Sequence, residues 1–518
     1  MHPPQAYGLP NVILWPPFNS APSESEMRHA VSDVPFQSAV QQSRALAAGE
    51  ISSRELVEIY LERIAVHNPA LNAVVTLDPG RARREAGKAD AARAAGQDLG
   101  PLHGVPITVK DSYETAGMRT VCGRTDLKDH VPDQDAEAVK RLRAAGAVIM
   151  GKSNMPPGNQ DVQADNPVFG PSSNPWDTTR TSGGSAGGGA VATAAGLTAF
   201  DFGSEIGGST RIPSHFNGLY GHKSTWRSIP LIGHVPYGPG AGRWTEADMA
   251  CGGAQVRDAR DLVPILRATV GPADYDGGFS YTLAPPRATR LGDFRVAVWS
   301  EDPSCPVDRD VTEAMDDVVA VLRTAGAKIT VQPASLPVDI ETNHRKAFSP
   351  LLFGAGDRTG LAPAPSAATL ARFVQHPRGD AGPALRGTFQ SHFHWLQAHM
   401  VRNELRQRWF EFFQDFDIVL MPVTPTAAPA HHDKPIDWFG RPFEVDGVRR
   451  PYWDQVKWSA VANVSGGPAT TIPVRRGRSG LPIGLQAMGP SGGDLTTIEF
   501  AALLGREVDG FVPPPDLV

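Results

Sequence analysis

The chain has 518 residues, of which 41% are hydrophobic and 20% are charged, and its formal net charge is only -6. These values exclude an intrinsically disordered chain, and they give no overall positive charge of the kind that attracts nucleic acid. No apolar run approaches the roughly 20 residues that span a bilayer, which excludes membrane insertion. The composition favours chemistry on a small molecule.

The N-terminal segment and the cysteines indicate the compartment. Residues 1–35 lack a basic start and are interrupted by prolines, so we expect an irregular arm and neither a signal peptide nor an anchor. Cys122, Cys251 and Cys305 lie far apart and form no C-x-x-C pair, which argues against a disulfide framework and a cysteine metal site. We therefore expect a cytoplasmic location.

The predicted elements begin near residue 35, and the first clear signal is a helix start. Ser52 and Glu55 form a capping box in front of apolar residues at helical spacing. This helix should end at Asn68-Pro69, because proline interrupts a helix. A second, alanine-rich helix is predicted over residues 81–96.

Two buried strands with a helix between them come next. After a glycine-proline turn, residues 105–109 predict the first strand, and Lys110 stands at its end. Asp135 should cap the following helix, Gly146 should end it, and residues 147–150 predict the second strand. The alternation of helix and strand indicates the α/β class.

The rest of the chain continues this alternation around a glycine-rich centre. Residues 158–190 are typical of a loop, residues 189–196 predict a tightly packed helix, and residues 198–202 predict a strand. A connector rich in proline and glycine, residues 272–292, precedes further strands and helices, including a long helix over residues 392–413. Glycine is densest toward the end of the 158–190 loop, where we expect the catalytic residues.

One glycine pattern there matches a nucleotide-binding P-loop. The spacing G-x-x-x-x-G-K-[ST] is met by Gly146, Gly151, Lys152 and Ser153. The residues between the two glycines are Ala-Val-Ile-Met, which predict a buried strand, and Met155-Pro156-Pro157 excludes the helix that should follow. We therefore reject the P-loop.

A second pattern matches the nucleophile elbow of α/β-hydrolases. Residues 183–187 fit G-x-S-x-G, with Ser185 as the nucleophile. An elbow needs an apolar strand before the serine, whereas residues 174–181 are typical of a polar loop. The elbow stays open as the less favoured of two serine-hydrolase interpretations.

A longer stretch carries the stronger evidence. The segment SGGSAGGGAVATAAGLTAFDFGSEIGGSTRIPSHFNGLYGHKST resembles the signature of the amidase-signature family, with a serine-glycine loop, a strand and a second loop that ends in Gly-Gly-Ser. Other blocks that resemble this family are PLHGVPITVKD, VIMGKSNMP, NPWD, DIVLMPVTP, ANVSGGPATTIPV and GLPIGLQAMGP. The resemblance covers roughly residues 40–510, and its blocks are specific in combination.

This resemblance implies a catalytic triad with no metal and no other cofactor. Ser209 is then the nucleophile, Ser185 relays the proton after a cis peptide bond from Gly184, and Lys110 is the general base. A lysine acts as a base only when neutral, so its pKa must fall from about 10.4 toward about 7 or 8. The resemblance also implies an oxyanion hole formed by the backbone N–H groups of Ile206, Gly207 and Gly208.

Three positions depart from the family pattern. Glu205 stands where aspartate is common, so its expected pairing with Arg211 must be re-aimed. Ser224 follows Lys223 where proline is common, and Pro157 stands where glutamate is common. None of these changes removes the triad chemistry, but Pro157 leaves the substrate contacts unpredicted.

The resemblance implies the α/β amidase-signature fold, a large mixed β-sheet flanked by α-helices. Residues 36–518 should form one domain, with a variable covering region at about 340–455. The expected activity is hydrolysis of a linear, non-peptide amide through an acyl-enzyme on Ser209. Carbamate (urethane) or ester hydrolysis is the alternative, and a glutamine amidotransferase subunit is the second alternative.

The expected partner is a small-molecule amide, carbamate or ester, and no nucleic acid. The oligomeric state is open, with a homodimer as one option. We expect no metal site, because the histidines lack the spacing H-E-x-x-H and supporting carboxylates. The histidines considered are His392, His394, His431 and His432.

Overall fold

The fold is organised by an eleven-stranded mixed sheet in the order β1-β3-β2-β6-β8-β7-β14-β15-β11-β9-β10. The computed structural model describes residues 34–97, 100–234, 247–354, 371, 387, 390–432, 441 and 443–517. The strands are β1 Val74–Leu77, β2 Pro106–Lys110, β3 Val148–Ser153, β6 Asp201–Glu205, β7 Tyr220–Lys223, β8 Cys251–Val256, β9 Arg295–Val298, β10 Lys328–Val331, β11 Ile418–Pro422, β14 Ala469–Arg476 and β15 Pro482–Met488. The predicted large mixed sheet is confirmed.

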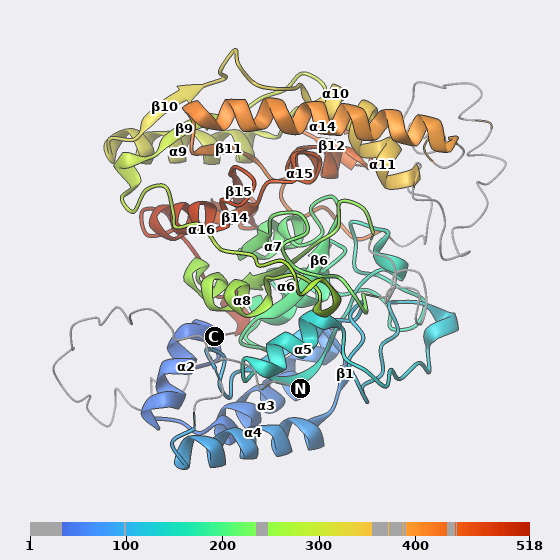
Figure 1. The fold of residues 1–518 in the computed structure, drawn as a ribbon, viewed down its shortest axis with the longest axis vertical. Helices are drawn as coiled ribbons and strands as arrows, with labels where there is room; N and C mark the ends of the chain where they lie inside the picture. Colours follow the sequence, from blue (N-terminus) through green and yellow to red (C-terminus); the bar gives the residue numbers. More distant parts are fainter. Residues whose placement is uncertain are drawn as a thin grey trace. The chain divides into compact units, whose positions relative to one another are not determined.

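Helices flank the sheet toward both of its edges. Their bounds are α2 Ala39–Ala48, α3 Ser53–Leu71, α4 Pro79–Ala94, α5 Glu137–Ala144, α6 Gly187–Ala194, α7 Arg211–Asn217, α8 Leu262–Thr269, α9 Arg309–Thr324, α10 Ile340–Thr342, α11 Ser349–Gly354, α14 His392–Asp415, α15 Asp454–Ser465 and α16 Asp494–Leu504. The helices α3 and α4 lie toward the β1 edge, and α9 and α14 lie at the opposite end, near β9 and β10 (Figure 1). The α/β class is therefore confirmed.

The first helices show where local signals succeed. The predicted capping box of Ser52 and Glu55 is present at the start of α3. The predicted end at Asn68-Pro69 is wrong, because α3 continues to Leu71 with the proline in its last turns. Proline removes one N–H group, and the helix still closes through Asn72, whose N–H donates to the Asn68 carbonyl at 2.7 Å.

The start of α5 differs from the prediction. Asp135 does not cap this helix; the residue at the cap position is Ala136, which makes no side-chain cap bond. The Asp135 carboxylate instead accepts the N–H of Ala116 at 2.8 Å and pairs with Arg143 at 2.9 Å. Each carboxylate oxygen of Asp135 thus has another partner, one in the loop after β2 and one in the last turn of α5, instead of the N–H groups of the first turn.

The strand β3 settles the P-loop question. It runs beyond the predicted end at residue 150 and includes Gly151, Lys152 and Ser153. It pairs in parallel with β2 and antiparallel with β1, so its backbone groups are used in the sheet. The rejection of a phosphate-binding loop here is confirmed.

The helix and the strand of the glycine-rich centre have different bounds from those predicted. The helix α6 spans 187–194 instead of 189–196, and β6 spans 201–205 instead of 198–202. Thr198 is not in the strand; its hydroxyl accepts the N–H of Thr108 at 2.9 Å. Because β2 pairs in parallel with β3 and β6, the ends of these strands bring Lys110 and Glu205 to one edge of the sheet.

The described part of the chain from Pro35 onward forms one compact unit. No helix among the described residues is both long and apolar enough to cross a membrane. The predicted N-terminal arm, residues 1–35, lies outside the described residues except for Val34 and Pro35. Several stretches of the predicted covering region, residues 340–455, also lie outside them.

Candidate active site

Lys110 is the last residue of β2, and its side chain is fully buried. The amine Nζ lies 2.7 Å from the Ser185 hydroxyl oxygen, 3.1 Å from the Ser204 carbonyl oxygen and 3.3 Å from the Ser204 hydroxyl oxygen. Burial lowers the pKa of Lys110 to about 7, although Asp201 and Glu205 act in the opposite direction. A substantial fraction of neutral amine is therefore present at neutral pH.

Ser185 lies in the serine-glycine loop before α6, and its side chain is buried. The peptide bond between Gly184 and Ser185 is cis, as predicted. A Cβ atom added to Gly184 would lie 2.6 Å from the Asp161 carbonyl oxygen and 2.6 Å from the Gln163 nitrogen, so no larger residue fits here. The loop thereby directs the Ser185 hydroxyl toward the Lys110 amine.

Ser209 lies in the loop between β6 and α7 and is partly exposed. Its carbonyl accepts the N–H of Ala186 at 3.0 Å, which holds the two serine loops together. Among the described residues, no hydrogen bond links the side chains of Ser185 and Ser209. The structure thus brings the Ser209 backbone beside Ser185, while the two hydroxyl groups are not directly joined.

The loop before Ser209 consists of Ile206, Gly207 and Gly208 and is closely packed. Within the described part of the chain, the N–H groups of Ile206, Gly207 and Gly208 have no hydrogen-bond partner. A Cβ atom added to Gly207 would lie 2.9 Å from the Phe348 ring. Gly208 has φ +105, and an added Cβ atom would lie 2.6 Å from the Ser459 Cβ atom. Close packing on both sides therefore requires glycine.

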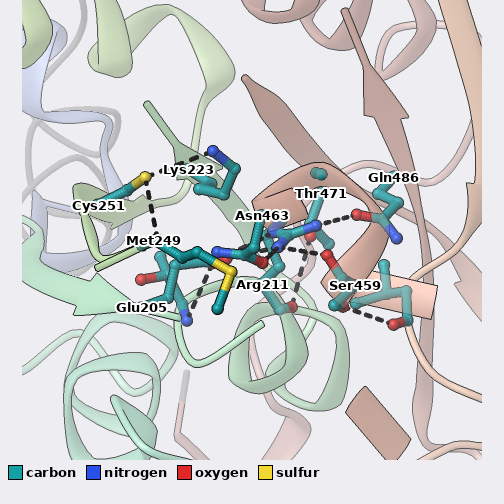
Figure 2. Close-up of polar contacts among 12 residues, drawn as sticks. Glu205, Arg211, Lys223, Met249, Cys251, Ser459, Asn463, Thr471 and Gln486 are labelled. Carbon is teal, nitrogen blue, oxygen red and sulfur yellow. Dashed lines mark hydrogen bonds and ion pairs between the residues drawn. The ribbon is translucent and has the colours of Figure 1, made fainter. Parts of the chain in front are cut away.

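The predicted ion pair of Glu205 and Arg211 joins the two ends of this loop (Figure 2). The Arg211 Nε donates to both carboxylate oxygens of Glu205 at 3.1 Å, so the longer glutamate still pairs side-on. The Nη2 atom of Arg211 donates to the Ser459 carbonyl and the Asn463 amide oxygen, each at 2.9 Å. Burial opposes ionisation of Glu205, but Arg211 lowers its pKa overall. The loop is thus tied to α15.

One neighbour of the lysine was not predicted from the sequence. The His234 ring nitrogen Nε2 lies 2.8 Å from the Ser204 hydroxyl oxygen, which itself lies 3.3 Å from the Lys110 amine. Both residues are buried. A lone histidine after a Leu-Ile-Gly turn carries no motif, so only the fold reveals this contact.

The segment before Ser185 was predicted as a polar loop, and this prediction is partly wrong. Residues Asp177–Thr181 form the strand β5, which pairs with β4, Ser173–Asn174. These two strands form their own small sheet outside the main one, so the serine does not follow a strand of the main sheet. Ser185 therefore does not stand at the end of a strand of the main sheet, which is the position that a nucleophile elbow requires.

No group of three or more His, Cys, Asp and Glu side chains suited to a metal ion occurs among the described residues. His431 and His432 lie in the segment after β11, and His392 and His394 lie in the first turn of α14. The structure does not bring these four residues together with acidic side chains as a metal site within its described part.

Comparisons with known proteins agree with this geometry. The sequence profile of the Amidase family matches residues 55–498. A glutamyl-tRNA(Gln) amidotransferase subunit from Roseiflexus sp. (strain RS-1) is 32% identical over 508 residues, covering 91% of this chain and 96% of that protein. A solved structure described as an unexpected vestigial protein complex that reveals the evolutionary origins of an s-triazine catabolic enzyme is 26% identical, with a TM-score of 0.75, covering 91% and 98% of the two chains. A crystal structure of an amidase is 26% identical, with a TM-score of 0.71, covering 91% and 100%.

Proposed function

Because this chain belongs to the amidase-signature family of hydrolases, we propose that it cleaves a linear carboxylic amide through an acyl-enzyme on Ser209. The observation that carries the proposal is the buried Lys110 amine, which lies 2.7 Å from the Ser185 hydroxyl and has a pKa of about 7. A serine is a weak nucleophile until a nearby base takes its proton. A neutral lysine in contact with a serine supplies such a base without any cofactor.

The proposed cycle begins with transfer of a proton. Neutral Lys110 takes the proton of Ser185, and Ser185 takes the proton of Ser209 as the Ser209 oxygen attacks the substrate carbonyl carbon. The backbone bond of 3.0 Å between Ala186 and Ser209 supports this order, because it keeps the two loops adjacent. The two hydroxyl groups must approach each other when substrate binds.

The N–H groups of Ile206, Gly207 and Gly208 donate hydrogen bonds to the oxyanion that forms on the substrate. Their lack of partners among the described residues supports this role. Donors that are already free and fixed stabilise the developing charge without reorganisation, and losing one such donor costs about 10²- to 10³-fold in rate. The protonated Lys110 then returns its proton through Ser185 to the leaving amine, and water hydrolyses the acyl-enzyme.

Carbamates and esters pass through the same acyl chemistry, so urethane and ester hydrolysis are the alternatives within this proposal. The substrate is a small molecule, and no nucleic acid is required. The three cysteines are unpaired in the structure, and a cytoplasmic location stays a prediction from their pattern. A homodimer and the single-domain arrangement of residues 36–518 with its covering region also stay predictions.

A second candidate is a subunit of a glutamine amidotransferase. The 32% identity to the glutamyl-tRNA(Gln) amidotransferase subunit from Roseiflexus, over 96% of that protein, favours it. Such a subunit would act with partner chains, whereas a hydrolase would turn over plain amides alone. Activity of the purified single chain on aryl and aliphatic amides, without ATP, decides for the hydrolase.

Covalent labelling tests the nucleophile. A fluorophosphonate should add one group to the chain, and peptide mapping should locate it on Ser209. Ser209→Ala should abolish labelling, while Ser185→Ala should slow it without moving the adduct. Ser182→Ala, in the same loop as Ser185, is the control and should label at close to the wild-type rate. An adduct on Ser185 in the wild-type protein would overturn the proposed order.

A further inference from the structure

The Ser204 hydroxyl lies between the Lys110 amine and the His234 ring. It is 3.3 Å from Lys110 Nζ and 2.8 Å from His234 Nε2. The carbonyl of the same serine is 3.1 Å from Lys110 Nζ. Serine therefore presents two oxygens to the lysine, and the hydroxyl has a second neighbour that can take its hydrogen.

His234 is held firmly in this position. Its backbone forms a β-bridge with Tyr113, and its N–H donates to the Leu231 carbonyl at 2.9 Å. The His234 ring meets the Tyr113 ring edge-on, with centroids 4.9 Å apart. The Tyr113 hydroxyl donates to the Gly203 carbonyl at 3.0 Å, next to Ser204 in β6. These contacts fix the backbone of His234, and the fixed Tyr113 ring packs against the imidazole beside Ser204.

The hydrogens and the lone pair of the neutral Lys110 amine determine which way the Ser204 hydroxyl must point. A neutral lysine amine has two N–H groups and one lone pair. The Ser204 carbonyl can only accept, so it takes one N–H. If the Ser204 hydroxyl accepts the other N–H, the lone pair faces Ser185. If the Ser204 hydroxyl donates instead, it occupies the lone pair, and the lysine cannot take the proton of Ser185.

We propose that His234 is a positioning residue for the base: its neutral ring accepts the Ser204 hydroxyl hydrogen at Nε2, so that Ser204 accepts from Lys110 and leaves the lysine lone pair facing Ser185. This proposal rests on the proposed function. The Ser204 hydroxyl also donates to His234 when Lys110 is protonated, because the Lys110 ammonium then donates to Ser185 and to both oxygens of Ser204. The Ser204 hydroxyl then still needs His234 as its acceptor.

The electrostatic surroundings keep the ring neutral. Burial and the charges of Lys110 and Lys152 lower the pKa of His234 to about 3. An imidazolium could not accept a hydrogen bond, so a neutral ring is what the role requires. The titratable groups around Lys110 and His234, from the strands and loops packed against them, are Asp111, Cys122, Lys152, Asp201 and Glu205.

A double-mutant cycle with Ser204 tests the proposal. His234→Leu should lower kcat about tenfold with little change in KM, because the freed Ser204 hydroxyl competes for the lysine lone pair. The variant should also move the acid limb of the pH profile to lower pH, because a Ser204 hydroxyl that donates to the Lys110 lone pair stabilises the neutral amine. In a Ser204→Ala background, His234→Leu should have almost no further effect on kcat.

The conservative variant provides the matched control. His234→Gln offers a carbonyl oxygen near the position of Nε2, so it should recover most of the activity and restore the acid limb. A purely structural role for His234 would lower kcat equally in the wild-type and Ser204→Ala backgrounds and leave the acid limb in place. That result, in a protein whose Ser209 is labelled normally, would overturn the role of His234. A wild-type protein with no adduct on Ser209 would overturn the proposed function instead.

A measurement on the wild-type protein covers the case in which His234→Leu does not fold. Nitrogen NMR of histidine-labelled protein, with His234 assigned through His234→Gln, reports the protonation of each ring nitrogen. The proposal expects a neutral ring with hydrogen on Nδ1 and a bare Nε2 throughout pH 5 to 9. Hydrogen on Nε2, or an imidazolium within that range, would overturn it.

Discussion

Two fully buried lysines, Lys110 and Lys152, occupy adjacent parallel strands, β2 and β3. The register pairs Val109 with Lys152 and Lys110 with Ser153, so the lysines are neighbours in the sheet. Burial lowers the pKa of both side chains, to about 7 for Lys110 and about 8 for Lys152. By burial and pKa alone, either lysine would qualify as a general base.

Their partners separate them. Lys152 donates to the Tyr113 carbonyl and, at 2.9 Å, to the Thr115 hydroxyl, and the charge of the Asp111 carboxylate favours the protonated form of Lys152 without a direct ion pair. The Asp111 carboxylate accepts the N–H groups of Val121 and Cys122 at 3.0 and 2.9 Å, so it fastens the loop that runs from Asp111 to Cys122.

The hydroxyl that Lys110 contacts, at 2.7 Å, belongs to Ser185, and the N–H of the next residue, Ala186, donates to the Ser209 carbonyl. A lowered pKa therefore identifies a buried lysine, and the partner decides whether that lysine acts as a base or as a structural cation.

The largest expected effect comes from removing Lys110, the lysine that contacts Ser185. Lys110→Met keeps much of the side-chain stem, and it should lower kcat by about 10³-fold or more, because general-base catalysis contributes about 10² to 10⁴. Amide hydrolysis at saturating substrate measures the loss. Near wild-type turnover by this variant across pH 6 to 9 would remove Lys110 from the mechanism.

Stability provides the control for this variant. The pKa of Lys110 is lower in the folded chain, at about 7, than the ordinary lysine value of 10.5, so its protonation favours the unfolded state. That cost is greatest below pH 7 and disappears as the pH rises toward 10.5. Lys110→Met should therefore raise the melting temperature more at pH 6 than at pH 9, which separates loss of catalysis from loss of fold.

The second largest effect should come from the other lysine, and on stability instead of rate. Lys152→Met leaves the buried Asp111 carboxylate without the cation that most lowers its pKa, and leaving a buried charge uncompensated costs up to about 3 to 5 kcal/mol. Urea unfolding measures the free energy. The folded fraction should keep kcat within a few-fold of the wild type. A loss of kcat as large as that of Lys110→Met, at normal stability, would contradict the division of roles.

The dependence of the rate on pH is the third effect. In the proposed mechanism the neutral amine of Lys110 is the active form, so kcat/KM should rise with pH and reach half of its plateau near pH 7, where the pKa of Lys110 lies. Below that point each pH unit should cost about tenfold, giving about a hundredfold loss by pH 5. Circular dichroism at pH 5 checks that the fold persists. A flat profile from pH 5 to 8 would show that a different group is the base.

Local signals in the sequence predicted the parts of the fold that local chemistry determines. Ser52 and Glu55 lie three residues apart and satisfy each other, so their capping box can be recognised without knowing the fold. Lys110 follows a short apolar run after a glycine-proline turn, and the strand end there was predicted correctly. The match to Gly151, Lys152 and Ser153 was rejected for the correct reason, since these residues lie in a buried strand.

Long-range contacts could not be predicted in this way. Asp135 looks like a helix cap until Ala116 and Arg143 take its oxygens. His234 contacts Ser204, 30 residues earlier in the chain, and neither residue belongs to a motif for that contact. The roles of Ser185 and Ser209 came from the family resemblance, and the catalytic triad stays a prediction until the adduct is mapped. Side-chain partners across elements are set by the sheet order, which no single segment contains.

The smallest expected effect is the one that tests the comparison of the two lysines most directly. If Lys152 is costly to remove because Asp111 is left charged and buried, removing both charges together should restore most of the stability. Asp111→Asn keeps a side-chain oxygen that can accept the N–H groups of Val121 and Cys122, which now bond to the carboxylate at 3.0 and 2.9 Å. The double variant Asp111→Asn with Lys152→Met should therefore unfold within about 1 to 2 kcal/mol of the wild type, whereas Lys152→Met alone loses more. Urea unfolding of the two single variants and the double variant gives the coupling energy between the two side chains.

Because neither residue faces Ser185, kcat of the double variant should stay within a few-fold of the wild type, with an unchanged acid limb. Additive losses of stability would mean that Asp111 and Lys152 act separately, and the contrast with Lys110 would then need a different physical cause.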